Sequence, residues 1–317
     1  MSKRKNLSIQ DIILSYGIYI AFAIICVVFA VLSPNFFMPS NIHNILIQTA
    51  AIGIVAIGQT LVILTGGIDI SVGRLMGLCG IMIGVAATKG VGLIGVLIIG
   101  VLCGLVIGVI NGFLIGYVRI PAFIATLGTQ GCCYGLALII SQGMPFSSFP
   151  DHFGWLGNST VGGVSVLVII AVILYIGFWI FSTRSRTGRY IYSIGGNCEA
   201  VRLSGINTAK YEMIAYTLCG LLAGIGGTLM ASRLEFASPA AGENYEMETI
   251  AAVVIGGTMM TGGSGSILKT SIGAILLYVL KNGLTLNNVS PYWQKIVTGA
   301  IIILAVTLDT MKHKKKV

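Results

Sequence analysis

The stretch GVLCGLVIGVINGFLIG, residues 100–116, lies within an apolar run that extends from about residue 91 to residue 118. Runs of about 20 apolar residues cross a bilayer as helices, because a helix satisfies its own backbone hydrogen bonds. The glycines recur at every fourth position, and positions four apart share one face of a helix. Such a stripe lets a second helix approach closely. We therefore predict a membrane-spanning helix that packs along Gly100, Gly104, Gly108, Gly112 and Gly116.

The rest of the chain has the same character. Of its 317 residues 56% are hydrophobic and 9% are charged, and the mean hydropathy is +0.94, whereas soluble domains carry about 25% charged residues. We predict an all-α, polytopic integral membrane protein, a single transmembrane domain over residues 1–317, with about ten transmembrane helices, some broken or re-entrant. The predicted spans are 12–32, 44–65, 75–88, 91–118, 121–141, 164–181, 213–232, 249–268, 271–288 and 296–308.

The net charge of +9 indicates orientation rather than a nucleic-acid partner. In membrane proteins Lys and Arg concentrate in the cytoplasmic loops. Most of them fall on one side if both termini are cytoplasmic, and the predicted outer loop 233–248 is acidic. The N-terminal MSKRKN and the apolar residues 12–32 fit a first span better than a signal peptide, because the apolar run is long and no cleavage motif follows.

Several chemical classes are excluded by the motifs. The seven cysteines show no CxxC spacing, so we predict neither disulfides nor a metal site. GVGLIG at 90–95 matches the dinucleotide-binding pattern, but no strand precedes it and no acidic residue follows at the required distance. The chain has no GxxxxGK[ST] motif, so any ATP that drives it binds to another subunit. We expect no cofactor.

The stretch LTGGIDISVGR, residues 64–74, contains the only acidic side chain between Asp11 and Asp151. Asp69 beside two glycines is a candidate pathway or ion site, because a charge inside a membrane is costly unless it is used or paired. The alternative is a structural role, in which Asp69 caps the next helix and pairs with Arg74. Ser71 adds a hydroxyl.

The stretch ETIAAVVIGGTMMTGGSGS, residues 248–266, interrupts a helical pattern with two Gly-Gly pairs and offers several hydroxyls. It is either the lining of a path for a hydrophilic solute or a glycine-rich helix crossing. Residues 256–273 echo residues 58–73, a hint of internal duplication. The candidate residues of the pathway or gate are Thr60, Asp69, Ser71, Thr126, Gly256, Gly257, Thr258, Gly262 and Gly263.

The stretch GRYIYSIGGNCEAVRLSGI, from residue 188 to residue 206, is unusually polar. We predict that Gly195-Gly196 breaks the chain, that Asn197 caps a helix of about two turns, and that Gly205 ends it. Glu199 and Arg202 then lie on one side. A helix this short needs a docking surface, which is either the protein's own cytoplasmic face or a partner subunit.

Several blocks of this chain resemble the permease subunit of ABC-type monosaccharide importers, and among them the ribose-type permeases of bacteria. The blocks are LSPNFFMPSN, GQTLVILTGGIDISVG, PAFIATLGT, GRYIYSIGGN, RLSGIN, CGLLAGIGG, IAAVVIGGT and KNGLTLNNVS, in this order. The chain differs at Cys198 and Val201, where similar permeases often have an acidic and a small or hydroxyl residue.

The resemblance implies a non-enzymatic permease of the bacterial inner membrane that imports a monosaccharide such as ribose. The implied partners are a cytoplasmic ATP-binding subunit, an extracytoplasmic sugar-binding protein and a second permease copy. The resemblance also implies that the polar segment is a coupling helix that contacts the ATPase. Its candidate residues are Gly195, Gly196, Asn197, Glu199, Arg202, Leu203, Ser204 and Gly205. The alternatives are an ABC permease for nucleosides or branched-chain amino acids, an ion-coupled transporter that uses Asp69, and a passive channel, which the lack of a charged filter disfavours.

Overall fold

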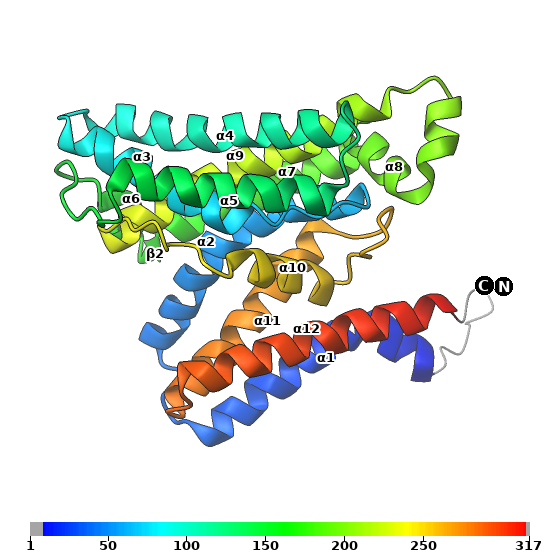
Figure 1. Cartoon of the computed structure of the whole chain (residues 1–317). Coiled ribbons are helices and arrows are strands. Elements are labelled where there is room, and N and C mark those ends of the chain that lie inside the picture. The colour runs from blue at the N-terminus through cyan, green and yellow to red at the C-terminus, as the bar shows by residue number, and fades with distance from the viewer. Residues whose placement is uncertain (1–8, 315–317) are drawn as a thin grey trace.

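The computed structural model describes residues 9–314, and most of these residues are helical (Figure 1). The helices are α1 (Ile9–Leu32), α2 (Pro39–Leu64), α3 (Val72–Thr88), α4 (Leu93–Gly116), α5 (Ala122–Ser141), α6 (Trp155–Asn158), α7 (Val166–Arg184), α8 (Arg186–Leu203), α9 (Thr208–Leu234), α10 (Tyr245–Ile255), α11 (Ile267–Leu286) and α12 (Pro291–Lys314). In the described part of the chain the only sheet is a small hairpin of β1 (Thr160–Val161) and β2 (Val164–Ser165).

Within the part of the chain that is described with its side chains, six helices are long and apolar enough to cross a membrane, namely α2, α4, α5, α7, α9 and α11. The prediction of an all-α polytopic membrane protein is confirmed, while the count of about ten spans stays a prediction. Every predicted span but one coincides with a single helix. The exception, 249–268, is not one continuous helix, because α10 ends at Ile255 and an irregular loop follows, which confirms the predicted interruption at the Gly-Gly pairs. At 1.5 Å per residue α10 is about 16 Å long, about half of the 30 Å hydrocarbon core.

The predicted glycine stripe packs on α9 along its whole length. A Cβ on Gly104 would lie 2.6 Å from the Gly224 Cα, and one on Gly108 would lie 2.7 Å from the Tyr216 carbonyl oxygen. At the far end of the stripe, a Cβ on Gly116 would lie 2.6 Å from the Ala209 carbonyl oxygen. The two backbones are therefore in direct contact, which confirms the packing role of the stripe. We call this contact the α4–α9 seam.

Helix α2 forms the centre of the molecule. In its most apolar 18-residue window 83% of the residues are buried, compared with 22% in the windows of α4 and α5. The outward faces of α4, α5 and α7 carry exposed aliphatic side chains, such as Ile94, Ile139 and Ile173, as expected for surfaces in contact with lipid.

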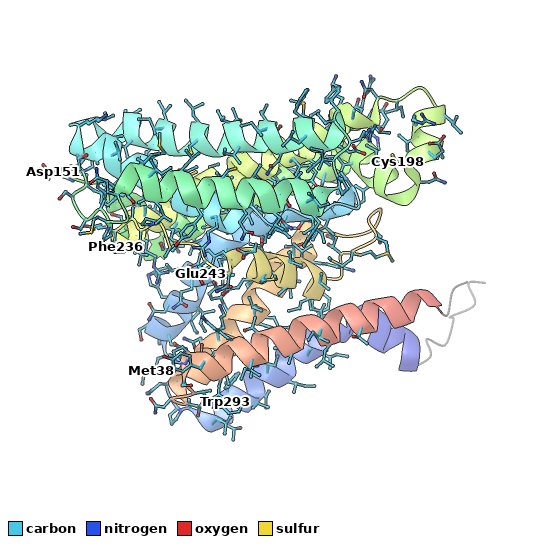
Figure 2. All side chains as sticks on the ribbon, in the orientation of Figure 1. Met38, Asp151, Cys198, Phe236, Glu243 and Trp293 are labelled. Carbon is cyan, nitrogen blue, oxygen red and sulfur yellow. The ribbon has the colours of Figure 1, made fainter. Side chains whose placement is uncertain are left out.

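The molecule has two distinct ends (Figure 1). One carries α8, and α1 begins and α12 ends at the same end. The opposite end carries α6 and the β-hairpin, and Figure 2 shows Cys198 far from Asp151 and Phe236. Helix α9 runs from the first end to the second, because it follows α8 in the chain and packs on α6 near its C-terminus.

Candidate functional site

The polar segment is a bent helix that projects at one end of the molecule (Figure 2). Asn197 leaves the helical conformation, with φ −160° and ψ 92°, and its Oδ1 accepts a hydrogen bond from the Ala200 backbone N–H at 2.9 Å. The prediction that Asn197 caps a short helix is thus confirmed, and Gly205, with φ +78°, follows the end of that helix. The predicted break at Gly195-Gly196 is wrong, because both glycines are helical and the bend falls one residue later.

The short helix, residues 198–203, exposes a charged pair and an apolar side chain. Arg202 Nη2 lies 2.7 Å from Glu199 Oε1, as the i, i+3 spacing predicts. Hydrogen bonds from Arg202 hold the pKa of the Glu199 carboxyl below its usual value. Leu203 is 77% exposed. Among residues 9–314 most of that leucine is left uncovered, so the short helix presents an apolar side chain for contact.

The helical part of α8 before the bend packs directly on the end of α2. A Cβ on Gly195 would overlap the Leu64 carbonyl oxygen and would lie 2.9 Å from the Gly262 Cα. The same Leu64 carbonyl accepts a hydrogen bond from Gly263 N–H at 3.0 Å. A Cβ on Gly263 would lie 2.7 Å from the Gly196 Cα. Three backbone segments therefore meet where glycine alone fits.

A second pair of glycines completes this contact. Gly66 and Gly262 have φ of +84° and +87°, and a Cβ on Gly262 would lie 2.7 Å from the Gly66 backbone nitrogen. Both occupy the same position of the echoed Thr-Gly-Gly sequences, and the two loops that contain these sequences touch. Tyr192 adds a hydrogen bond from its hydroxyl to the Gly265 carbonyl oxygen at 3.1 Å. We call Gly66, Gly195, Gly196, Gly262 and Gly263 the glycine junction.

The glycine junction brings together two groups of candidates that the sequence predicted separately. Gly195 and Gly196 were candidates for coupling, and Gly262 and Gly263 were candidates for the gate. They come from the projecting helix α8 and from the loop that interrupts the α10–α11 pair. Helix α8 and this loop are therefore in direct backbone contact.

Asp69 is fully buried in the loop between α2 and α3. Its Oδ1 accepts hydrogen bonds from the Ser71 backbone N–H at 2.9 Å and from the Ser71 hydroxyl at 2.6 Å. Asn111 of α4 donates to the Ser71 Oγ at 2.9 Å and lies 3.5 Å from the Asp69 Oδ2. Gln59 pairs with the Asp69 backbone when its amide nitrogen faces the carbonyl oxygen at 3.2 Å. These four residues form a buried polar cluster that joins α2, α4 and the loop.

The predicted pairing of Asp69 with Arg74 is wrong. Arg74 Nη2 lies 3.4 Å from Glu243 Oε2, and its guanidinium carbon lies 4.2 Å from the centre of the Tyr134 ring. Asp69 also does not cap α3, because the N-cap residue is Ser71 and no side chain completes that cap. The carboxylate instead bonds two residues ahead within its own loop, as in an Asx turn.

The other candidates differ in their contacts, and only Thr60 and Gly256 join two helices. Thr60 of α2 and Thr270 of α11 are linked through their hydroxyl oxygens at 2.9 Å. The Thr126 hydroxyl donates to the Ala122 carbonyl oxygen in the preceding turn at 2.8 Å. The buried Thr258 hydroxyl has no partner among the described residues. Gly256 packs on the backbone of α11 at Thr270, whereas Gly257, with φ +83°, faces open space.

Sequence reasoning missed Asn111 and Gln59, which complete the buried polar cluster. Asn111 is the one amide in the apolar stretch 100–116. An amide there must find partners inside the protein, and this was the available signal. Among the described residues, no group of three or more His, Cys, Asp or Glu side chains is placed to hold a metal ion.

Comparison with known proteins identifies the family. Residues 41–306 match the family described as branched-chain amino acid transport system / permease component. The ribose import permease protein of Escherichia coli (strain K12) is 43% identical over 302 residues, 93% of each chain. The ribose import permease protein of Bacillus subtilis (strain 168) is 38% identical over 98% of this chain and 97% of its own.

A permease named for other sugars is also similar. The galactose/methyl galactoside import permease protein of Escherichia coli (strain K12) is 33% identical over 95% of each chain. No solved structure matches this chain. With a family match over most of its length and relatives above 30% identity, this chain belongs to the family of transport-system permease components.

Proposed function

We propose that this protein is the membrane-spanning permease of an ATP-driven importer that passes a monosaccharide such as ribose into the cytoplasm. One observation carries the proposal: the glycine junction connects the projecting helix α8 to the interrupted α10–α11 pair inside the apolar bundle. The relatives named as ribose and galactose import permeases support a sugar as the substrate.

ATP hydrolysis belongs to a separate cytoplasmic subunit, since the chain has no phosphate-binding GxxxxGK[ST] loop. That subunit docks on the short helix, where exposed Leu203 supplies an apolar anchor and Arg202 a charged contact. This docking makes the α8 end cytoplasmic, and with it both termini. An extracytoplasmic sugar-binding protein delivers the sugar at the opposite end, and a second copy of the chain completes the pathway in the bacterial inner membrane.

The mechanism follows from the contacts. When ATP draws its binding subunits together, the short helix moves with them. Backbone packed on backbone is stiff, so the movement is transmitted from Gly195 to the end of α2 and to the loop 256–266. Loop glycines at positive φ allow that loop to change conformation at low cost. The loop 256–266 then acts as the gate, with Thr258 available to the passing sugar.

An ion-coupled transporter is the rival, and the surroundings of Asp69 argue against it. Its carboxylate is enclosed by neutral donors from Ser71 and Asn111. It lines neither the cavity beside α6 nor the cavity beside Tyr278. A coupling ion would have to break these bonds to reach it, so the buried polar cluster is a structural link between helices.

Reconstitution tests the proposal. Permease, ATP-binding subunit and sugar-binding protein are placed in proteoliposomes, and uptake of radiolabelled D-ribose is measured with and without ATP and with an ionophore. We expect uptake that requires ATP and is unchanged by the ionophore. Uptake that continues without ATP and stops with the ionophore would contradict the proposal. Parallel assays with D-galactose, a nucleoside and leucine compare the substrate classes.

A further inference from the structure

A small cavity is lined by Arg233 and Leu234 at the C-terminal end of α9. Phe236, which follows two residues later, lies at the end of the bundle opposite α8 (Figure 2). Its volume is about 140 Å³, the room of about five water molecules at about 30 Å³ each. Sites for drug-sized ligands begin at about 300 Å³, so this cavity suits a single small ring. Four helices form it, α2, α9, α10 and α11.

The lining combines aromatic rings with planar polar groups. Tyr245 and Tyr278 supply the rings, Arg233 and Gln48 supply hydrogen-bonding groups, and Ala51 supplies apolar wall. A monosaccharide presents C–H groups on its faces and hydroxyls around its edge. Aromatic rings suit the faces, while guanidinium and amide groups suit pairs of neighbouring hydroxyls. The lining therefore has the chemistry of a sugar site.

The tyrosine wall is held in place from behind. The Tyr278 hydroxyl donates to Glu248 Oε2 at 2.8 Å, and Lys281 forms an ion pair with the same carboxylate. These bonds use the polar end of Tyr278 and fix the plane of its ring, which lowers the cost of ordering the site on binding.

Arg233, in contrast, has its donors available. Its backbone is fixed, because Gly157 of α6 packs on it and donates through its N–H to the hydroxyl of neighbouring Ser232 at 3.0 Å. In residues 9–314 its guanidinium makes no ion pair or hydrogen bond. A positioned arginine with free donors at the edge of a cavity is poised to bind hydroxyl oxygens.

We infer that this cavity binds one monosaccharide and is the first site in the permease that the sugar contacts after delivery. The inference rests on the proposed function, which makes the end opposite α8 the outer one. Arg233 contacts the sugar hydroxyls, Gln48 contacts the edge of the ring, and Tyr245 contacts its face. The site is weak, because a transporter must release what it binds.

Arg233→Lys separates this role from a structural one. Arg233 lies in the last turn of α9, where any cation interacts favourably with the helix dipole. Lysine keeps that charge but loses the planar pair of donors. A structural role thus predicts no change, whereas a sugar contact predicts a loss. Tyr245→Ala removes the stacking face, and Tyr292→Ala, at a tyrosine that is 79% exposed, is the matched control.

The test measures sugar contact without the sugar-binding protein and transport with the full complex. Saturation-transfer difference NMR of D-ribose on the permease–ATPase complex in nanodiscs measures contact, and uptake in proteoliposomes measures transport. For Arg233→Lys and Tyr245→Ala we expect loss of the NMR signal and an uptake rate about tenfold lower, with complex assembly unchanged. Tyr292→Ala should behave as the wild type.

Two results would overturn the inference. One is an unchanged NMR signal and unchanged uptake in both cavity variants while the wild type transports ribose. The other is the loss of a tightly bound phospholipid in Arg233→Lys, detected by mass spectrometry, with the ribose signal intact, since the cavity would then hold a lipid. A wild-type complex that hydrolyses ATP but takes up no sugar would instead refute the proposed function.

Discussion

The molecule uses glycine in two regions with opposite consequences. In the α4–α9 seam the glycines are helical and bring two long helices into backbone contact over the length of α4. In the glycine junction three of the five glycines, Gly66, Gly262 and Gly263, have positive φ and lie in loops. The seam fixes helices side by side, whereas the junction joins a projecting helix to loops that can change shape.

A glycine, which has no side chain, thus serves either close packing or movement, depending on the backbone conformation around it. A helical glycine costs stability in isolation, and the close packing it permits offsets this cost. A loop glycine at positive φ keeps access to other conformations. We therefore expect substitutions in the seam to lower the amount of folded protein, and those substitutions in the junction that meet a neighbouring backbone to lower transport.

The largest effect is expected for Gly104→Leu in the seam. The added side chain has no room beside Gly220 and Gly224 of α9, and overpacking of this kind costs about 1–3 kcal/mol or more. We expect little folded permease in the membrane, measured by fluorescence-detection size-exclusion chromatography. Gly128→Leu, on α5 where nothing lies within 4 Å, is the control and should accumulate normally.

The next largest effect is expected for Gly195→Ala, in contrast to its neighbour Gly196→Ala in the glycine junction. A Cβ on Gly195 would overlap the Leu64 carbonyl oxygen, whereas a Cβ on Gly196 meets nothing within 4 Å. Gly195→Ala should reach the membrane at close to the normal level but lose most ATP-driven uptake, about tenfold or more, because α8 is pushed away from α2. Gly196→Ala should transport normally. Equal uptake by the two variants would refute the junction as the coupling contact.

Gly262→Ala and Gly257→Ala compare two loop glycines at positive φ. Both substitutions carry the left-handed strain of about 1–2 kcal/mol. Gly262→Ala also meets the Gly66 backbone, whereas Gly257→Ala meets only open space. We expect Gly262→Ala to abolish uptake and Gly257→Ala to reduce it a few-fold, with both proteins inserted. A larger loss of uptake in Gly257→Ala than in Gly262→Ala would show that the glycine most critical for gating lies outside the glycine junction.

The smallest effect is expected for Asp69→Asn in the buried polar cluster. Asparagine keeps an acceptor oxygen for the Ser71 N–H and hydroxyl, so the link between helices survives. We expect uptake within about threefold of the wild type and a free energy of unfolding that is lower by about 1 kcal/mol. Asp69→Leu removes the acceptor and should destabilise the protein by more. Complete loss of uptake in folded Asp69→Asn would support the ion-coupled alternative.

The sequence predicted the elements that depend on local patterns. Hydrophobic run length located most helices, four-residue spacing identified the seam, and the Asn197 cap with the Glu199–Arg202 spacing identified the short helix. These features follow from helix geometry and neighbouring residues alone.

What the sequence could not predict depends on contacts between distant segments. The Gly-Gly pairs in 249–268 predict that the helix is interrupted, but they do not reveal that the resulting loop contacts Gly66 and Gly195. Arg74 pairs with Glu243 rather than with nearby Asp69, since the fold brings α3 beside the loop before α10. The meeting of Gly195 with Gly263 is likewise a property of the packed fold.

The most direct test of the account replaces both exposed groups of the short helix with Arg202→Glu and Leu203→Ala. Losing the apolar anchor and reversing the charge should weaken binding of the ATPase at least tenfold and abolish sugar-stimulated ATP hydrolysis, at a normal membrane level of permease.

A charge swap, Glu199→Arg with Arg202→Glu, is the matched control for this variant. It preserves the ion pair within the helix while it reverses what a partner contacts. The decisive measurement is the amount of ATPase that co-purifies with each variant, together with its stimulation by sugar-loaded binding protein. We expect the amount of co-purified ATPase and its stimulation to fall in the double variant and also in the charge swap. Unchanged association and stimulation in the double variant would contradict the docking of the ATPase on the short helix.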